Sequence, residues 1–265
     1  MMDFTPTAAE TMNQAINAAI DKALEAESAA QVPRDYLGGS RLGVECLRAL
    51  GYEWRDQQAK KPKGFPGRAL RRFRMGHLHE DETVAWLRKA GFDVRTHDES
   101  GHQFGFAVAF ENGVPRIKGH IDGAILSGPV ALPYPLLWEH KIMNASNWSA
   151  FKKDGCAKSK PVYYGQVQTY MPYMELENGC LFTALNTDTS DLWFEFIKYD
   201  QKVATDMVAR GAEVICARSP EELVRIGRDS TDFKCKFCDH KEECWKVPMA
   251  PAVAAPTWIT AGRAA

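Results

Sequence analysis

The spacing of apolar residues predicts helices in the first third of the chain. Residues 8–30 are rich in alanine with polar residues between, which is typical of a helix. Ser40 is placed to cap a short second helix that continues through Leu50. Residues 69–90 carry apolar side chains at helical spacing, and Gly91 follows where glycine commonly ends a helix. We therefore expect the chain to begin with helices.

The middle of the chain changes to the short apolar runs that strands show. Runs at 105–110, Arg116–Leu126 and Pro135–Met143 are separated by turn residues and predict three strands. Two further strands are predicted at 180–186 and 192–198. Helices are predicted between and after the strands, at residues 144–153, 161–177, 200–217 and 220–227. This order of elements predicts an α/β or α+β fold built on a mixed sheet.

Composition narrows the class of protein without identifying it. The chain has 265 residues, of which 45% are hydrophobic and 25% charged, as in ordinary globular proteins. A net charge of −1 excludes binding to nucleic acid through bulk charge. No apolar stretch is long enough to span a bilayer, and the N-terminus lacks the pattern of a secretory signal. We therefore expect a cytoplasmic protein that does not associate with membranes.

Basic residues are nevertheless clustered in two places. The first cluster lies in and after an exposed loop expected at 55–67 and comprises Lys60, Lys61, Lys63, Arg68, Arg71, Arg72 and Arg74. The second comprises Lys152, Lys153, Lys158 and Lys160. The ordinary interpretation is a solvated surface. The alternative is that both clusters flank a channel for DNA.

Two carboxylates and a lysine are predicted to meet in the middle of the chain. Glu139 and Lys141 are two residues apart in the predicted strand 135–143, so they point to the same face. Asp122 ends the preceding strand beside Gly123, where the backbone can bend. If the two strands form a hairpin, Asp122 and Glu139 converge.

Such a group suits the hydrolysis of a phosphodiester. Carboxylate oxygens are the ligands that Mg²⁺ prefers, and the metal lowers the pKa of a bound water. A neighbouring lysine can orient that water and stabilise the charge that develops on phosphorus. The acid-x-lysine pattern alone more often marks an ordinary salt bridge. A carboxylate in so apolar a strand is costly, however, unless it is paired or metal-bound.

Two helices add further polar candidates. Glu80 can supply a third metal oxygen, with His77 or His79 as nitrogen ligands, although three contiguous acids there also fit a solvated helix face. Gln166 and Tyr170 are four residues apart and share a helix face, from which they can donate to phosphate or stack on a base. The alternative for this second pair is a packed helix with polar flanks.

In order, the chain contains Gly76-x-x-x-Glu80, Gly119-x-x-Asp122, Glu139-x-Lys141 and Gln166-x-x-x-Tyr170. This series resembles the PD-(D/E)xK nuclease superfamily in its RecB-like branch, which includes phage recombination exonucleases and CRISPR-associated RecB-type nucleases. The resemblance implies a restriction-endonuclease-like α/β core, with a central mixed β-sheet flanked by helices. It divides the chain into an N-terminal helical extension (1–37), a nuclease domain (38–246) and a flexible tail (247–265).

The resemblance also implies an activity. Asp122 and Glu139, with Glu80, would bind Mg²⁺ or Mn²⁺, and Lys141 would be the catalytic lysine. The branch often has histidine in place of Glu80, and His79 is the alternative ligand. Gln166 and Tyr170 would contact DNA. We therefore expect a metal-dependent DNA exonuclease of phage or bacterial recombination or end processing. The alternative is a non-catalytic nucleic-acid-binding or assembly subunit with a nuclease-like fold.

The same resemblance points to partners. The expected partners are DNA, a single-strand annealing or recombination protein, and further copies of the chain in an oligomer. The compartment would be the cytoplasm of a bacterial or phage-infected cell. A zinc-dependent binding module built on the C-terminal cysteines is a further alternative, but it leaves the acidic core strands unexplained.

Three cysteines lie close together near the C-terminus, in the spacing Cys235-x₂-Cys238-x₅-Cys244, which indicates a metal site. His240 is a candidate fourth ligand, and such a set would bind zinc. Iron–sulfur members of the RecB-like branch use one N-terminal and three C-terminal cysteines around a [4Fe–4S] cluster. The resemblance therefore adds Cys46 as the fourth ligand, and the cluster would join the N- and C-terminal parts of the chain. Unliganded thiols are the remaining alternative.

Overall fold

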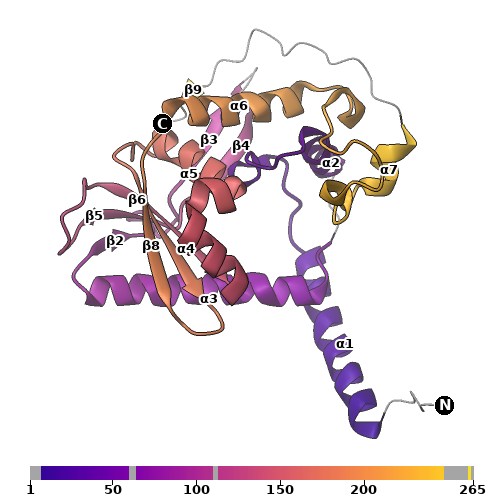
Figure 1. Ribbon diagram of the computed structural model, residues 1–265, viewed down its shortest axis with the longest axis horizontal. Coiled ribbons are helices and arrows are strands. Elements are labelled where there is room, and N and C mark those ends of the chain that lie inside the picture. The colour runs from indigo at the N-terminus through magenta and orange to yellow at the C-terminus, as the bar shows by residue number, and fades with distance from the viewer. Residues whose placement is uncertain (1–6, 60–63, 110–112, 248–261, 264–265) are drawn as a thin grey trace.

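The computed structural model describes residues 7–59, 64–109, 113–247 and 262–263, which form two mixed sheets flanked by helices (Figure 1). Most of the tail predicted at 247–265, and Lys60, Lys61 and Lys63 of the first basic cluster, lie outside these described residues. The predicted class, an α/β fold with helices flanking a mixed sheet, is confirmed, except that the described strands form two sheets instead of one central sheet.

The larger sheet has five strands and holds the candidate residues. Its order is β2 (Asp93–Arg95), β5 (Gly123–Ser127), β6 (Leu136–Met143), β7 (Cys180–Asn186) and β8 (Leu192–Ile197). Strands β6 and β7 are parallel, and the other neighbours are antiparallel. All seven residues of β7 are buried, which explains its apolar run.

The smaller sheet has the order β1 (Leu37–Gly38), β4 (Pro115–His120), β3 (Gly105–Ala109) and β9 (Gly262–Arg263). The single strand predicted over Arg116–Leu126 is wrong. It is divided between β4 in this sheet and β5 in the larger one, and Asp122 lies at the division. The chain changes sheets here because each half pairs with a different partner, β4 with β3 and β5 with β6.

Seven α-helices lie within the described residues. They are α1 (Ala8–Ala29), α2 (Leu47–Gln58), α3 (Gly67–Lys89), α4 (Ala145–Ser159), α5 (Pro161–Tyr173), α6 (Gln201–Cys216) and α7 (Lys241–Lys246). Apolar residues of α4 and α5 pack on one face of the five-stranded sheet, and those of α3 pack on the other. Helices α2 and α6 share a separate core with β1 and β4.

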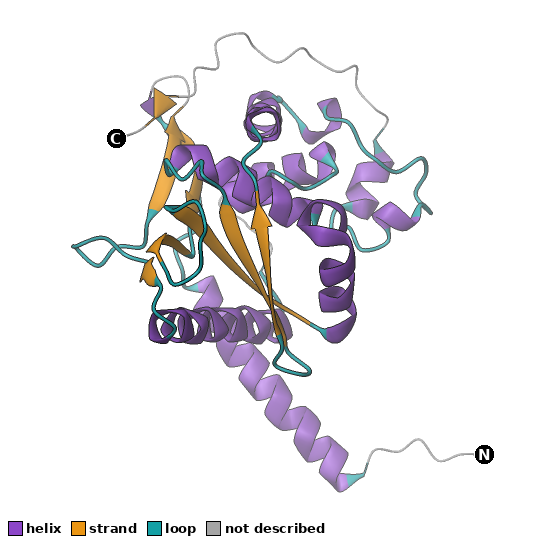
Figure 2. Cartoon of the chain, turned by 60° about the vertical axis from the view of Figure 1, so that its left-hand side comes forward, coloured by secondary structure: helices purple, strands orange, loops and turns teal. Residues whose placement is uncertain are grey.

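Helix α1 confirms the helix predicted for the N-terminal extension, and it projects away from the body of the molecule (Figure 2). Thr7 begins it with a capping box, in which Thr7 and Glu10 exchange hydrogen bonds. Only its last turns touch α3, where Asp21 pairs with Arg71 and Glu25 accepts a hydrogen bond from the Gly67 amide.

Two predicted helix positions are wrong for tertiary reasons. Ser40 lies in a short 3₁₀ turn rather than capping a helix, and α2 begins only at Leu47 and runs to Gln58, into the predicted loop. The helix predicted at 220–227 is reduced to a 3₁₀ turn at Pro220–Glu222. In that segment the carbonyls of Glu221 and Leu223 accept hydrogen bonds from the buried Arg48 guanidinium instead of from a following helical turn.

Gly119 permits a close contact that a side chain would prevent. A Cβ atom there would lie 2.6 Å from Phe106 and 2.9 Å from Tyr170. We expect Gly119→Ala to lower the free energy of unfolding by about 1–3 kcal/mol through overpacking. Gly76→Ala is the matched control, because nothing lies within 4 Å of its Cβ position on α3. It should stabilise the protein by about 1 kcal/mol. Denaturant unfolding measures both, and equal effects would contradict this account.

Candidate active site

Strand β6 places Glu139 and Lys141 on the face covered by α4 and α5. Residues of β6 alternate, so Trp138 and His140 face α3 instead. The Lys141 ammonium donates to Glu139 Oε1 and, at 3.0 Å, to the carbonyl of His140. The predicted side-by-side arrangement of Glu139 and Lys141 is therefore present.

Asp122 reaches the same place from the junction of β4 and β5. The hairpin between β5 and β6 pairs Gly123 with Trp138, which brings Asp122 beside the middle of β6. Asp122 Oδ2 accepts a hydrogen bond from the His140 amide at 2.8 Å and lies 3.6 Å from the Lys141 ammonium. The structure thus brings together Asp122, Glu139 and Lys141 as the sequence predicts.

Glu139 is fully buried, and this governs its ionisation. Burial raises the pKa of Glu139 to about 7, and the charge of Asp122 acts in the same direction. Lys141 and the amide of Gln166, which donates to Glu139 Oε1 at 2.6 Å, oppose that rise. Glu139 Oε2 is buried and has no hydrogen-bond partner among the described residues.

Lys141 remains protonated despite its surroundings. Burial lowers the pKa of its ammonium, but Asp122 and Glu139 together raise it above its ordinary value. His140, on the opposite face, behaves differently. Its pKa falls to about 3, because of burial first and then the charges of Lys141 and His79. The neutral imidazole of His140 and the charged ammonium of Lys141 therefore lie on opposite faces of β6.

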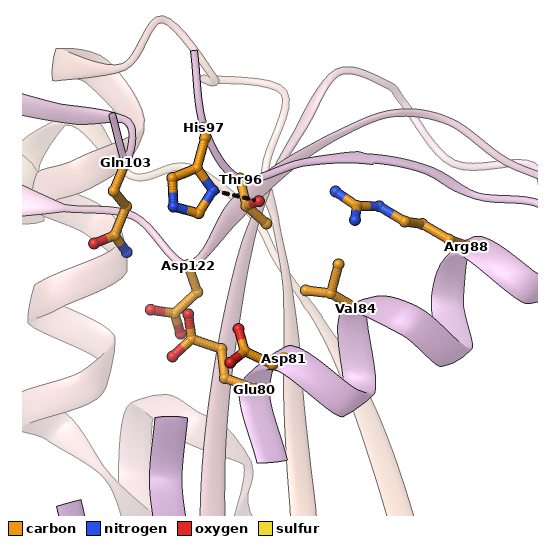
Figure 3. A pocket seen from close by; sticks show the side chains of 8 residues that line it. All are labelled: Glu80, Asp81, Val84, Arg88, Thr96, His97, Gln103 and Asp122. Carbon is orange, nitrogen blue, oxygen red and sulfur yellow. Dashed lines mark hydrogen bonds between the residues drawn. The ribbon is translucent and has the colours of Figure 1, made fainter. Parts of the chain in front are cut away.

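Glu80 approaches the group from α3. Burial raises the pKa of Glu80 to about 8, and the charge of Asp122 adds to the rise. Figure 3 shows the carboxylates of Glu80 and Asp122 pointing toward one another. Of the two predicted nitrogen ligands, His77 has a largely exposed side chain whose Nδ1 is 3.7 Å from Glu80 Oε2. His79 interacts electrostatically with His140, whose side chain is on the face of β6 opposite to that of Lys141.

Gln166 and Tyr170 lie beside the site but are almost completely buried. Gln166 holds Glu139, as described above. The ring of Tyr170 packs edge-on against Phe106 and closely against Gly39 and Gly119. Burial raises the pKa of Tyr170 well above its usual range. Their predicted contact with DNA stays a prediction, while their contacts within the protein position Glu139 and the junction that carries Asp122.

The donor set fits a divalent cation chemically. Three carboxylates, one with a buried unpartnered oxygen and two with raised pKa values, are what a hard cation would stabilise. As the side chains lie, no group of three His, Cys, Asp or Glu residues in the described ranges is arranged to hold a metal ion. Glu139 Oε1 is instead bonded to Lys141 and Gln166. Binding would require these side chains to turn.

The four predicted cluster cysteines lie far apart in the sequence, and the structure relates them through Cys238. Burial raises the pKa of the Cys238 thiol, and electrostatic interactions with Cys46, Cys235 and Cys244 raise it further, so each of these three lies within electrostatic range of Cys238. Two ion pairs join the same segments. Lys234 pairs with Glu45 at 2.7 Å, and Arg55 of α2 pairs with Glu243 of α7 at 2.7 Å.

The thiols fit a soft metal or an iron–sulfur cluster by their chemistry. Here too, no three potential ligands among the described residues are arranged to hold a metal ion, and the described cysteines are free thiols. His240, the alternative zinc ligand, stacks its ring on Tyr52 with centroids 5.1 Å apart. Ion pairs connect the segments that carry Cys46 and Cys244, and their predicted joining by a metal cluster stays a prediction.

A pocket of roughly 360 Å³ adjoins Glu80 and Asp122. Its other lining residues are Asp81, Val84, Arg88, Thr96, His97 and Gln103 (Figure 3). None of these six belongs to a motif in the sequence. They come from α3 and from the segment between β2 and β3, and no local pattern indicates that the segment folds back over Asp122.

Metal affinity should rise with pH. The raised pKa values of Glu139 (about 7) and Glu80 (about 8) favour their neutral forms, so Mg²⁺ must displace protons. The stability these two groups give the metal-free protein is full below their ordinary pKa, and it is lost as pH rises through 7 and 8. We therefore expect saturating Mg²⁺ to raise the melting temperature more at about pH 8.5 than at about pH 6. A larger shift at the lower pH would contradict this assignment.

Comparison with known proteins gives the fold alone. The chain matches no family model and no curated protein sequence. The crystal structure of SSO0001 has a TM-score of 0.50 and 16% identity, covering 88% of this chain and 97% of that one. An alkaline exonuclease, LHK-Exo from Laribacter hongkongensis, has a TM-score of 0.45 and 17% identity, covering 73% of this chain and 92% of its own.

LHK-Exo in complex with dAMP also has a TM-score of 0.45, at 14% identity, covering 75% of this chain and 90% of its own. At 16% identity, the match to SSO0001 shows similarity of fold and not of activity. Among the helices the structure describes, none is both long and apolar enough to cross a bilayer.

Proposed function

We propose that this protein is a divalent-metal-dependent deoxyribonuclease that hydrolyses phosphodiester bonds, acting as an exonuclease in DNA recombination or end processing. The observation that carries the proposal is the buried convergence of Asp122, Glu139 and Lys141, with one oxygen of Glu139 unpartnered among the described residues. An ordinary structural salt bridge has no need of a second buried carboxylate, and a third carboxylate nearby at Glu80 makes the group costly without a cation.

Asp122, Glu139 and Glu80 would hold Mg²⁺ or Mn²⁺. The bound cation supplies a water of lowered pKa and neutralises charge on the phosphate. Lys141, kept protonated by its two acidic neighbours, stabilises the negative charge that develops on the phosphoryl oxygens. Gln166 keeps the Glu139 carboxylate oriented through its bond to Oε1. Because His140 is neutral, it adds no second positive charge next to Lys141.

DNA would approach over basic surfaces on both sides of the site. The N-terminal half of α3 carries Arg68, Arg71, Arg72 and Arg74, and α4 carries the second basic cluster with Lys160 at its C-cap. Lys152 lies over the rings of Trp148 and Trp193, 5.2 and 4.8 Å from their centroids. Positive charge beside aromatic rings suits a nucleic-acid strand. A recombination partner protein and an oligomeric state stay predictions.

The proposed function includes a [4Fe–4S] cluster on Cys46, Cys235, Cys238 and Cys244, and zinc is the alternative occupant. The cluster would hold the C-terminal segment against α2, next to the ion pairs described above. Iron and acid-labile sulfide in a ratio near one to one, after anaerobic purification, support the cluster. Zinc without iron would replace it with the alternative.

The proposal is tested by incubating the full chain with end-labelled linear DNA and with closed circular DNA, each with Mg²⁺ or Mn²⁺. The expected result is loss of the label from linear DNA, no cleavage of the circle, and no reaction in the presence of a chelator. Binding of DNA without cleavage under all metal conditions would favour the non-catalytic assembly subunit instead.

A further inference from the structure

The pocket beside Glu80 and Asp122 has two chemically different ends (Figure 3). One end is acidic and belongs to the candidate metal site. The other end carries an imidazole, an amide and a hydroxyl, from His97, Gln103 and Thr96. An acidic end repels a bare phosphate, so a phosphate enters it only together with a cation. The end with the imidazole, amide and hydroxyl suits a nucleoside, while the Arg88 guanidinium, which also lines the pocket, is bonded to the Val94 carbonyl.

His97 and Gln103 are held side by side by the backbone. They form an antiparallel bridge, and directly paired residues of such a bridge point to the same side. The turn between them is fixed by Asp98, whose carboxylate accepts hydrogen bonds from the amides of Ser100 at 2.8 Å and His102 at 2.9 Å. The pair is therefore a preformed part of the wall.

Each of the two side chains has one polar atom already engaged. His97 Nδ1 lies 2.9 Å from the Thr96 hydroxyl, and Gln103 Nε2 donates to the Ile121 carbonyl at 3.0 Å. His97 Nε2 and Gln103 Oε1 are the remaining acceptor or donor atoms of these groups. Because Ile121 directly precedes Asp122, the Gln103 bond also fixes the pocket wall relative to the metal site.

We infer that His97 and Gln103 bind the nucleotide next to the scissile phosphate, so that the pocket takes one deoxynucleoside monophosphate as its complex with a divalent cation. This inference rests on the proposed function and assigns its substrate subsite. A volume of roughly 360 Å³ is near the lower end of small-molecule pockets, about 300–1,000 Å³, which suits a single nucleotide. An imidazole can stack on a base, and an amide oxygen can accept from a base edge.

The test measures binding of deoxyadenosine and deoxythymidine 5′-monophosphates to the full chain by calorimetry, with Ca²⁺ and with chelator. We expect binding only with Ca²⁺, and a roughly tenfold loss of affinity in His97→Ala and in Gln103→Ala. Gln103→Glu keeps the size of the side chain but adds a negative charge, and it should weaken binding further. His102→Ala is the matched control, because this histidine lies in the same turn with its side chain 81% exposed. It should bind as the wild type does.

In DNA cleavage, the His97 and Gln103 variants should raise KM about tenfold while kcat changes by less than about threefold. Equal nucleotide affinity in the wild type and all three pocket variants, or binding that is independent of Ca²⁺, overturns the inference. A wild-type protein that fails to cleave DNA refutes the proposed function instead, and the calorimetric arm still decides the pocket. Wild-type melting temperatures in the variants show that the turn has remained folded.

Discussion

Lys141→Ala is expected to lower kcat for DNA hydrolysis by at least about 100–1,000-fold, the effect of removing one preorganised charge-stabilising donor. The ammonium lies between Asp122 and Glu139, and no other cation pairs with either carboxylate in the part of the chain that the structure describes. KM should change little, since the side chain is mostly buried and contributes more to the transition state than to the approach of DNA. Initial rates on end-labelled linear DNA with saturating Mg²⁺ measure this effect.

Lys202→Ala is the control for that variant. Lys202 also pairs with an acid, Asp206, at 2.6 Å, but its side chain is 83% exposed on α6 and belongs to neither basic cluster. Its removal should leave kcat unchanged. The assignment of Lys141 fails if its alanine variant keeps kcat within about threefold of the wild type while melting at the same temperature.

Asp122→Asn should weaken metal binding strongly and abolish hydrolysis, with little effect on the fold. The amide oxygen of asparagine can still accept the hydrogen bond from the His140 backbone, so the junction between β4 and β5 is kept. The lost negative charge is what the cation requires. We expect the affinity for Mn²⁺ to fall by more than the roughly 10–100-fold that loss of an outer-shell partner costs.

Calorimetric titration with Mn²⁺ measures the loss, beside Asp206→Asn as control. Asp206 is also an ion-paired aspartate, bonded to Lys202 at 2.6 Å, but its side chain is 53% exposed on α6. Wild-type Mn²⁺ affinity in Asp122→Asn would show that the metal binds elsewhere.

The core of the site was predictable because it depends on local geometry. Alternation along β6 places Glu139 and Lys141 together whatever the rest of the fold does. The hairpin that brings Asp122 to them follows from two apolar strands with turn residues between them. The single error there, one strand in place of β4 and β5, concerns the division that Asp122 marks. Sequence periodicity does not report which sheet a strand joins.

The parts that sequence analysis missed depend on contacts between distant segments. Two helix boundaries depend on one such contact: α2 begins at Leu47, and the helix predicted after Pro220 is lost. Arg48 donates hydrogen bonds to the carbonyls of Glu221 and Leu223, which lie about 170 positions away in the sequence. The pocket wall at His97 and Gln103 depends on a turn that folds over Asp122. No period in the sequence predicts such contacts, because each is decided by tertiary structure.

The cysteine group depends partly on local spacing and partly on contacts between distant segments. Their spacing identified Cys235, Cys238 and Cys244 as one group, and the resemblance added Cys46 from a position about 190 residues earlier. In the structure Cys46, Cys235 and Cys244 each interact electrostatically with Cys238, but they are not grouped as metal ligands in the described ranges. Spacing does not distinguish iron–sulfur from zinc, since the same thiolates serve both.

The central claim is that Asp122 and Glu139 hold a divalent cation beside Lys141. Anomalous diffraction from crystals soaked in Mn²⁺ measures this directly. The account predicts a manganese peak within coordination distance of the Asp122 and Glu139 carboxylates, with the Lys141 ammonium turned from Glu139 toward the substrate side. Manganese bound elsewhere, with Lys141 still paired to Glu139, would contradict it.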